Sequence, residues 1–210
     1  MRIYAYLWQF FAFTPINING KDNIPTEGPF LICANHGSFM DIPVIYVAFQ
    51  NYFVFAGKKE IEKWPLFHIF YTSGMNILVD RHNPKGDLKA FKRMMETIDA
   101  GHPLAIFPEG TITKNAPLLG EFKDGAFLLA LKKEIPILPV TFLNNWRRLE
   151  RKGLWKGHGG PGISKVIIHQ PINCVNYNKS DVEVLKELIK KTISDPIYQK
   201  YHINTQKGNA

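Results

Sequence analysis

The sequence has 210 residues, a length that fits one domain able to bury roughly 70% of its unfolded surface. Its net charge of +8 and isoelectric point near 9.4 favour acidic partners, such as phosphorylated small molecules, an anionic membrane surface or nucleic acid. The two cysteines, Cys33 and Cys174, have neither a metal-ligand spacing nor a disulfide framework, which fits a reducing, cytosolic compartment. Histidine-rich metal motifs of the HExxH kind are absent from the sequence.

The N-terminal residues 1–13 are apolar and rich in aromatic side chains, and we expect a helix there. The run is much shorter than the roughly 20 residues that cross a bilayer. No small-residue cleavage site follows it, so a signal peptide is not expected. Two interpretations stay open: a monotopic helix lying in the membrane interface, or a first helix packed on the core. We therefore divide the chain into an N-terminal aromatic helix, residues 1–17, and a main domain, residues 18–210.

Beyond a polar lead-in over residues 17–28, strand and helix signals alternate along the chain. Apolar or β-branched runs predict strands at residues 30–34, 52–56, 75–79, 104–107, 135–142 and 166–169. Helical spacing of apolar residues predicts helices at residues 42–49, 64–71, 88–98, 124–133 and 180–193. The alternation is typical of an α/β fold with a mostly parallel central sheet flanked by helices. Pro136 and Pro139 indicate a sheet edge or a strand start, and Ser180 with Glu183 predicts a cap for the last helix.

A histidine and a carboxylate stand at a fixed short separation where the first buried strand ends and a helix begins. In one regular helix the side chains of His36 and Asp41 would point about 140° apart and could not touch. Gly37 allows a tight bend, so that Asp41 can turn back and accept a hydrogen bond from one ring nitrogen of His36. Ser38 is better used as a helix cap and Cys33 belongs to the strand, so the simplest chemistry is a base that activates a substrate hydroxyl. The alternative is an ordinary loop histidine beside a helix-start carboxylate.

Polar residues also follow the third and fourth predicted strands, as Asp80 with Arg81 and as Glu109 with Gly110. In a mostly parallel sheet these strand ends lie on the same side as His36. The guanidinium of Arg81 suits a phosphate, and such a charge-assisted hydrogen bond is worth about 1.5–3 kcal/mol. Alternatively, Arg81 pairs with Asp80 or Glu109. Gly110 lets a ligand approach closely, and Glu109 can accept a hydrogen bond from a substrate hydroxyl.

Four blocks stand in order along the chain: residues 35–41 with His36 and Asp41, residues 74–81 ending in Arg81, Phe-Pro-Glu-Gly-Thr at residues 107–111, and residues 135–140. Together they resemble the blocks of the glycerolipid acyltransferase family, specifically the bacterial 1-acylglycerol-3-phosphate acyltransferases. Residues 57–60, which include Lys58 and Lys59, resemble a lysine-rich segment that these enzymes carry between the first two blocks. Any block alone is a weak signal, whereas four in the right order at compatible intervals are a strong one.

The resemblance implies transfer of a fatty acyl group from acyl-CoA or acyl-carrier protein to the hydroxyl of a lysophospholipid, lysophosphatidate, giving phosphatidate. It implies no metal, no cofactor and no acyl-enzyme intermediate. By this match His36 is the general base and Asp41 its orienting partner. The expected substrate-binding residues are Arg81 for the phosphate, Glu109, Gly110 and Thr111 for the acceptor site, and Lys58. Apart from the match, the tetrahedral oxyanion needs donors, and backbone N–H groups, Lys58 or Lys59 could supply them.

The third block departs from the family pattern just after Thr111. Where the family usually continues with an arginine and a small polar residue, this chain has Ile112 before Thr113. Lys114 could replace the missing charge, or the acceptor carries a different head group, such as that of an amino-acid lipid. The second block also lacks its common aromatic residue before Arg81.

Lipid substrates imply contact with an anionic membrane surface, and residues 146–156 mix cations with tryptophans as a headgroup-contacting segment would. A solvated basic loop would have the same composition. We expect a peripheral or monotopic protein on the cytoplasmic face of the cell membrane. The competing class is a non-catalytic nucleic-acid-binding protein, suggested by the charge. The sequence has no recognisable nucleic-acid-reading module, so no nucleic acid partner is predicted.

Overall fold

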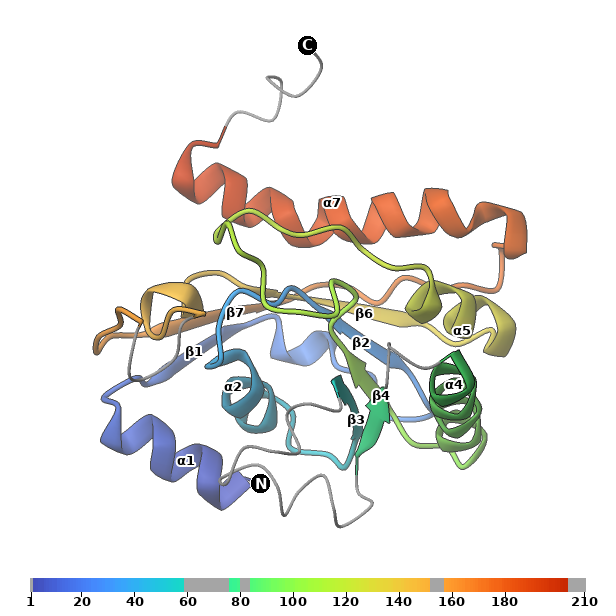
Figure 1. Ribbon diagram of the computed structural model, residues 1–210, viewed down its shortest axis with the longest axis horizontal. Coiled ribbons are helices and arrows are strands. Elements are labelled where there is room, and N and C mark those ends of the chain that lie inside the picture. Colours follow the sequence, from blue (N-terminus) through green and yellow to red (C-terminus); the bar gives the residue numbers. More distant parts are fainter. Residues whose placement is uncertain (1, 59–75, 80–83, 152–156, 204–210) are drawn as a thin grey trace.

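The structure is a computed structural model in which residues 2–58, 76–79, 84–151 and 157–203 are described. The described strands form one seven-stranded sheet in the order β1-β7-β6-β2-β5-β3-β4. Neighbouring strands are parallel except β6 and β7, which run antiparallel. The predicted mostly parallel α/β fold is therefore confirmed (Figure 1). The strands are β1 Ile16–Asn19, β2 Leu31–Ala34, β3 Val54–Lys58, β4 Ile77–Val79, β5 Leu104–Ile106, β6 Ile137–Phe142 and β7 Ser164–Ile168.

Helices cover both faces of the sheet, and alternation along the strands decides what each face packs against. In β2, Leu31 and Cys33 point into a core built with α4, α5 and α7, whereas Ile32 and Ala34 point into a core built with α2. Because both faces are buried, β2 is apolar throughout, as its sequence predicted. The helices are α1 Arg2–Phe11, α2 Asp41–Ala48, α4 Pro84–Asp99, α5 Gly125–Lys133 and α7 Val182–Tyr201, with short 3-10 turns η1 Lys21–Asn23, η3 Asn145–Arg147 and η4 Lys179–Asp181.

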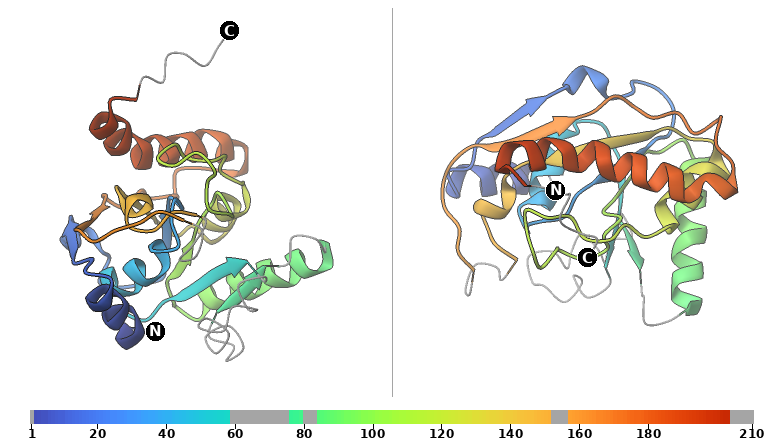
Figure 2. Two further views of the ribbon diagram at one scale, coloured as in Figure 1. Left: turned by 60° about the vertical axis from the view of Figure 1, so that its left-hand side comes forward. Right: turned by 90° about the horizontal axis from the view of Figure 1, so that it is seen from above.

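The N-terminal helix α1 lies against α2, on the opposite side of the sheet from α7 (Figures 1 and 2). Ala5 and Gln9 are buried in this contact, and the indole nitrogen of Trp8 donates to the sulfur of Met40. Much of the helix surface still faces outward: Ile3 is 78% exposed and Phe10 71%. One face of α1 packs on the core, and another is exposed as a membrane-interfacial helix requires, so both interpretations of this segment have a physical basis. Within the described ranges, no helix is both long and apolar enough to cross a bilayer.

The sheet differs from the expectations at β1 and at β6. Residues 16–19 form the edge strand β1, although the polar lead-in was expected from residue 17. This strand pairs with β7 through Ile16 and Ser164 and crosses the division expected at residue 17. The strand β6 is interior, between β7 and β2, so its prolines do not mark a sheet edge. The alternative, a strand start, fits Pro136, which directly precedes Ile137, the first residue of β6. Pro139 is tolerated because the β6–β7 ladder begins only at Val140. Its carbonyl accepts the backbone N–H of His169, so Pro139 contributes to the pairing with the β7 segment as an acceptor only.

The last helix also differs from its prediction. It runs through Pro196 to Tyr201 instead of ending near residue 193. The expected cap of Ser180 and Glu183 is replaced by a capping box in which Asn178 and Asp181 bond to each other's backbone N–H. This box caps the turn η4, which directly precedes α7. The helix predicted at residues 64–71 lies outside the described residues.

Candidate active site

The candidate site lies at the carboxyl end of β2, in the loop that joins this strand to α2. The loop begins with Asn35, whose side chain accepts from the backbone N–H of Phe142 at 2.7 Å and donates to its carbonyl at 3.1 Å. This pair of bonds fixes the loop to the last residue of β6. The next residue, His36, is therefore held at the edge of the sheet where ligands of α/β proteins bind.

The predicted contact between His36 and Asp41 is present. The Nδ1 atom of His36 lies 2.9 Å from Oδ2 of Asp41, and Asp41 is fully buried. The same oxygen accepts the backbone N–H groups of Gly37 at 2.9 Å and Ser38 at 2.8 Å. A carboxylate can only accept, so Nδ1 of the neutral ring carries the proton and Nε2 keeps its lone pair. The bend at Gly37 thus produces the orientation that a base requires.

Ser38, expected as a helix cap, forms only half of a capping box with Asp41. Its backbone N–H donates to Asp41, but its hydroxyl accepts from the N–H of Met40 and donates to the carbonyl of Leu149. Since the side chain is fully buried and bonded in both directions, Ser38 is a structural link between this loop and the turn after η3.

Asn145 was not predicted from the sequence. Its Nδ2 donates to Oδ1 of Asp41 at 2.9 Å, so both carboxylate oxygens have donors. Asn145 begins η3, shortly after the end of β6. The signal that could have found it is the pair Asn144–Asn145 just after a buried strand, which resembles the polar strand ends at His36 and Glu109.

The loop after β5 holds His36 from the other side. The ring of Phe107 stacks on the imidazole with centroids 3.9 Å apart and planes at 10°. Oε1 of Glu109 accepts the backbone N–H of His36 at 2.7 Å, and the carbonyl of His36 accepts the N–H of Thr113 at 2.9 Å. Ring and backbone of His36 are therefore both fixed before any substrate binds, which is the preorganisation that catalysis needs.

Glu109 acts in this structure as a brace for the backbone. Its second oxygen accepts the N–H of Gly120 at 2.7 Å, and the side chain is buried. The geometry places it behind His36, so the predicted contact with a substrate hydroxyl stays a prediction. In the same loop Gly110 has a positive φ of 70°, which a glycine adopts without strain, and Thr111 is exposed. Ile112 packs inward where the family block has an arginine.

The carboxyl group of Glu109 should make stability depend on pH. Burial raises its pKa to about 7 from an ordinary 4.5, against the opposing effect of the two backbone donors. Between these values the folded protein holds a proton that the unfolded chain has released, so the free energy of unfolding falls as pH rises. We expect a loss approaching about 3 kcal/mol between about pH 5 and pH 8, measured by urea unfolding.

The matched variant for this measurement is Glu109→Gln, which removes the titrating group and keeps the shape of the side chain. Its stability should change less than that of the wild type over the same pH range. Parallel pH profiles for the two proteins would show that Glu109 does not titrate there.

The other predicted site residues are only partly described. Lys58 ends β3, whose carboxyl end faces the same edge of the sheet as that of β2, because β3, β5 and β2 are parallel. Arg81 and Lys59 lie outside the described residues. Among the described residues no three His, Cys, Asp or Glu side chains gather as metal ligands would.

The described part of the basic tract at residues 146–156 packs on the fold more than was expected. The ring of Trp146 packs against that of Tyr201 on α7, with the ring centroids 5.7 Å apart. The guanidinium of Arg147 lies 5.1 Å from the centroid of each ring. Arg148 donates to the carbonyls of Gly160 and Pro161. This part of the tract joins η3 to α7 and to the loop before β7, so the exposed cations left for the predicted headgroup contact within residues 146–151 are Arg147 and Arg151.

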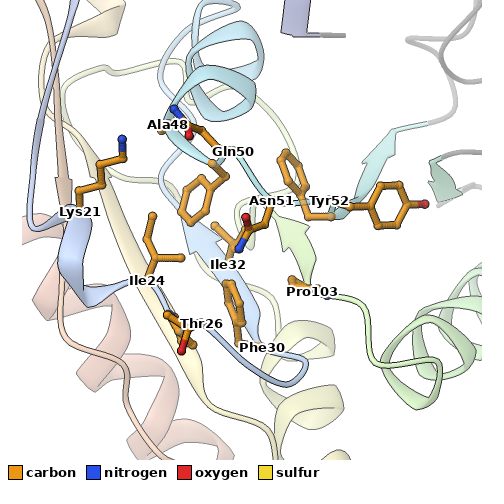
Figure 3. Close-up of a pocket in the computed structure, with 13 residues that line it drawn as sticks. Lys21, Ile24, Thr26, Phe30, Ile32, Ala48, Gln50, Asn51, Tyr52 and Pro103 are labelled. Atoms are coloured by element: carbon orange, nitrogen blue, oxygen red, sulfur yellow. The ribbon is translucent and has the colours of Figure 1, made fainter.

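A cavity of about 210 Å³ lies at the other end of the sheet (Figure 3). Phe30 and Pro103, which precede β2 and β5, line it together with Ile24 and Ala48. Because it adjoins the amino ends of the strands and the C-terminal end of α2, it is separate from the site around His36.

Comparison with known proteins agrees with the sequence blocks. A family model described as Acyltransferase matches residues 15–143. The 1-acyl-sn-glycerol-3-phosphate acyltransferase of Helicobacter pylori is 34% identical over 69% of this chain and 61% of its own length. The probable 1-acyl-sn-glycerol-3-phosphate acyltransferase of Mycoplasma genitalium is 32% identical over 83% of this chain and 68% of its own. The chloroplastic 1-acyl-sn-glycerol-3-phosphate acyltransferase BAT2 of Brassica napus is 32% identical, and the match covers 80% of this chain and 49% of that protein.

The fold is shared with a solved structure. The crystal structure of the 1-acyl-sn-glycerophosphate (LPA) acyltransferase PlsC from Thermotoga maritima matches 97% of this chain and 78% of its own chain, with a TM-score of 0.78 and 23% identity. The chain spans about half to two thirds of the length of the curated relatives it matches. From the family match and these relatives, the chain belongs to the acyltransferase family, as its four sequence blocks predicted.

Proposed function

We propose that this chain is a 1-acylglycerol-3-phosphate O-acyltransferase in which His36 is the general base and Asp41 its orienting partner. The observation that carries the proposal is the 2.9 Å contact between Nδ1 of His36 and Oδ2 of Asp41, which leaves Nε2 free to take a proton. The names of the relatives support the reaction class.

The nucleophile is then the hydroxyl of the substrate. Ser38 is buried, with its hydroxyl bonded in both directions. Cys33 is buried in β2, and burial raises the pKa of its thiol far above the ordinary range, so it stays protonated and unreactive. Neither side chain next to His36 is available to form an acyl-enzyme.

The reaction follows from these roles. Nε2 of His36 removes the proton of the acceptor hydroxyl while the oxygen attacks the thioester carbonyl carbon. The tetrahedral intermediate collapses with cleavage of the carbon–sulfur bond, and the leaving thiolate takes the proton from the imidazolium. Lys58 is the proposed donor to the oxyanion, Arg81 the proposed phosphate ligand, and Glu109, Gly110 and Thr111 shape the acceptor site. The proposed donor is acyl-CoA or acyl-carrier protein, and the proposed reaction uses no metal or cofactor.

One observation favours a second acceptor. Ile112 is buried at the position where the family block has an arginine, so that side chain offers no charge to a phosphate. A different lyso-lipid, such as an amino-acid lipid, is the alternative acceptor for the same chemistry.

The test is an acyl-transfer assay with purified protein. Lysophosphatidate and other lyso-lipids are each offered with acyl-CoA and with acyl-carrier-protein thioesters, and the products are separated by mass. We expect phosphatidate from at least one donor. Product only from another lyso-lipid would favour the second acceptor. No transfer from any pair, together with salt-dependent binding to oligonucleotides, would favour the non-catalytic alternative.

We propose further that α1 attaches the protein to the membrane that holds its lipid substrate. Phe10 and Phe11 are 71% and 73% exposed on a helix whose opposite face packs on α2. Burying a phenylalanine side chain is worth about 1.5–3 kcal/mol, so the two rings would contribute much of the binding free energy.

Replacing both rings, Phe10→Ser with Phe11→Ser, should lower vesicle binding at least about tenfold in flotation assays. The matched control is Leu88→Ser on α4, which removes a side chain that is 72% exposed elsewhere on the surface and should leave binding unchanged. Vesicles with and without anionic lipid measure the electrostatic part. Equal recovery of the double variant and the control would contradict a role for α1.

A further inference from the structure

Two consecutive asparagines follow β6, and they do different things. The side chain of Asn144 bonds to backbone groups at the start of β7. Its Nδ2 donates to the carbonyl of Ile163, and its Oδ1 accepts the N–H of Lys165, both at 2.8 Å. Asn145 bonds through its side chain to Asp41 instead, at 2.9 Å. Both side chains are buried, so the difference lies in their partners rather than in their exposure.

The bond from Asn145 determines how the carboxylate of Asp41 can turn. Oδ2 accepts from three N–H groups, those of His36, Gly37 and Ser38. Oδ1 has Asn145 as its donor. A carboxylate held on one oxygen only could rotate about its Cβ–Cγ bond, and the imidazole would follow it. With donors on both oxygens the carboxylate plane is fixed.

The other end of the Asn145 side chain argues against a purely structural role. Its Oδ1 is buried and has no hydrogen-bond partner among the described residues. A buried carbonyl without a donor is costly, and native proteins contain few of them. An amide kept only to join two segments would have both ends bonded, as Asn144 does.

The turn that contains Asn145 is itself fastened to the catalytic loop. The carbonyl of Asn145 accepts the N–H groups of Arg148 and Leu149, and the carbonyl of Leu149 accepts the hydroxyl of Ser38. The segments 145–149 and 38–41 are therefore joined at two points, one of them Asp41. Movement of the turn would be passed directly to the carboxylate.

We propose that Asn145 is a positioning residue of the reaction, which fixes the carboxylate of Asp41 so that His36 keeps its Nδ1–H tautomer and presents Nε2 to the acceptor hydroxyl. The inference rests on the proposed function of His36 and Asp41. Asn145 acts through Asp41, whose Oδ1 accepts its side-chain N–H.

Kinetics of paired variants test the proposal. Asn145→Ala should lower kcat about 10–100-fold, the equivalent of losing one hydrogen bond to a charged group, with KM for either substrate unchanged. Asn145→Asp keeps the shape and loses the NH2 donor, so it should lose at least as much kcat. Asn144→Ala is the matched control, because it removes a buried asparagine from the same turn; it should lower the Tm and change kcat little.

A second measurement does not depend on activity. In protein labelled with ¹⁵N-histidine, ring-nitrogen shifts report the tautomer of each of the 7 histidines, and His36→Gln identifies the signal of His36. The wild type and Asn144→Ala should show the Nδ1–H tautomer alone, and Asn145→Ala a mixture of tautomers. If the wild type transferred no acyl group at all, the proposed function would fail while this test could still be read.

Three outcomes would overturn the proposal. One is a kcat for Asn145→Ala within about twofold of the wild type, since no catalytic effect would then remain to be explained. Another is recovery of activity in Asn145→Asp, which would show that Asn145 only fills space. The third is an unchanged His36 tautomer in Asn145→Ala together with a fall in Tm like that of Asn144→Ala, which would assign the residue to stability.

Discussion

Replacing His36 by alanine is expected to lower kcat about 10²–10⁴-fold, because the variant lacks the base that takes the proton of the acceptor hydroxyl. The protein should stay folded. Asp41 keeps three of its four donors, those of Gly37, Ser38 and Asn145, so no buried charge is left uncompensated. The measurement is initial-rate transfer of a labelled acyl group at saturating substrate, with the Tm followed by circular dichroism.

The control for this prediction is a second histidine, one that is partly buried. His169, just beyond β7, has its Nε2 2.8 Å from the hydroxyl of Thr141, and in the sheet β6 separates β7 from β2. His169→Ala should change the Tm and leave kcat within a few fold of the wild type. Near-wild-type turnover by His36→Ala would remove the imidazole from the mechanism, whatever happened to the control.

The contact between His36 and Asp41 was predictable because every signal for it is local. A buried strand ends just before the pair, Gly37 permits the bend, and a helix begins at Asp41. Each of these signals lies within a few residues of the contact. Short-range geometry could therefore be worked out from the chain alone.

The rest of the site depends on contacts between distant segments. Asn145 is 104 residues from Asp41 in the sequence, and neither segment contains a pattern that predicts contact with the other. Glu109 was recognised as a site residue, but its partners are the backbone N–H groups of His36 and Gly120. Every residue except proline carries such a group, so no residue type in the sequence indicates that Glu109 bonds to these two backbone positions.

The errors in the fold have the same origin. The strand β1 contains only two apolar residues, Ile16 and Ile18, and is a strand because β7 lies beside it. Pro136 and Pro139 suggested a sheet edge or a strand start, since proline cannot donate to a ladder. Where the antiparallel ladder starts along β6 is decided by β7, and the sequence of β6 does not contain that information.

Asp41→Asn is expected to be nearly as severe as the loss of the base, with a fall in kcat of about 10²–10⁴-fold, although the fold should tolerate it. The new amide can present its oxygen to the three N–H groups that Oδ2 now accepts. Its NH2 group would then face Asn145, whose unpartnered Oδ1 could accept from it after a flip of the Asn145 amide. Hydrogen bonding survives in this arrangement, but the negative charge that stabilises the imidazolium is lost.

The comparison with Asp41→Ala separates charge from structure. That variant leaves all four donors without an acceptor, so it should lower the Tm strongly, whereas Asp41→Asn should not. Combining His36→Ala with Asp41→Asn should give a kcat within about threefold of that of His36→Ala alone, because Asp41 acts only through the imidazole and groups that act as a unit are not additive. Losses that multiplied in the double variant would mean that Asp41 contributes to the transition state by a route that does not pass through His36.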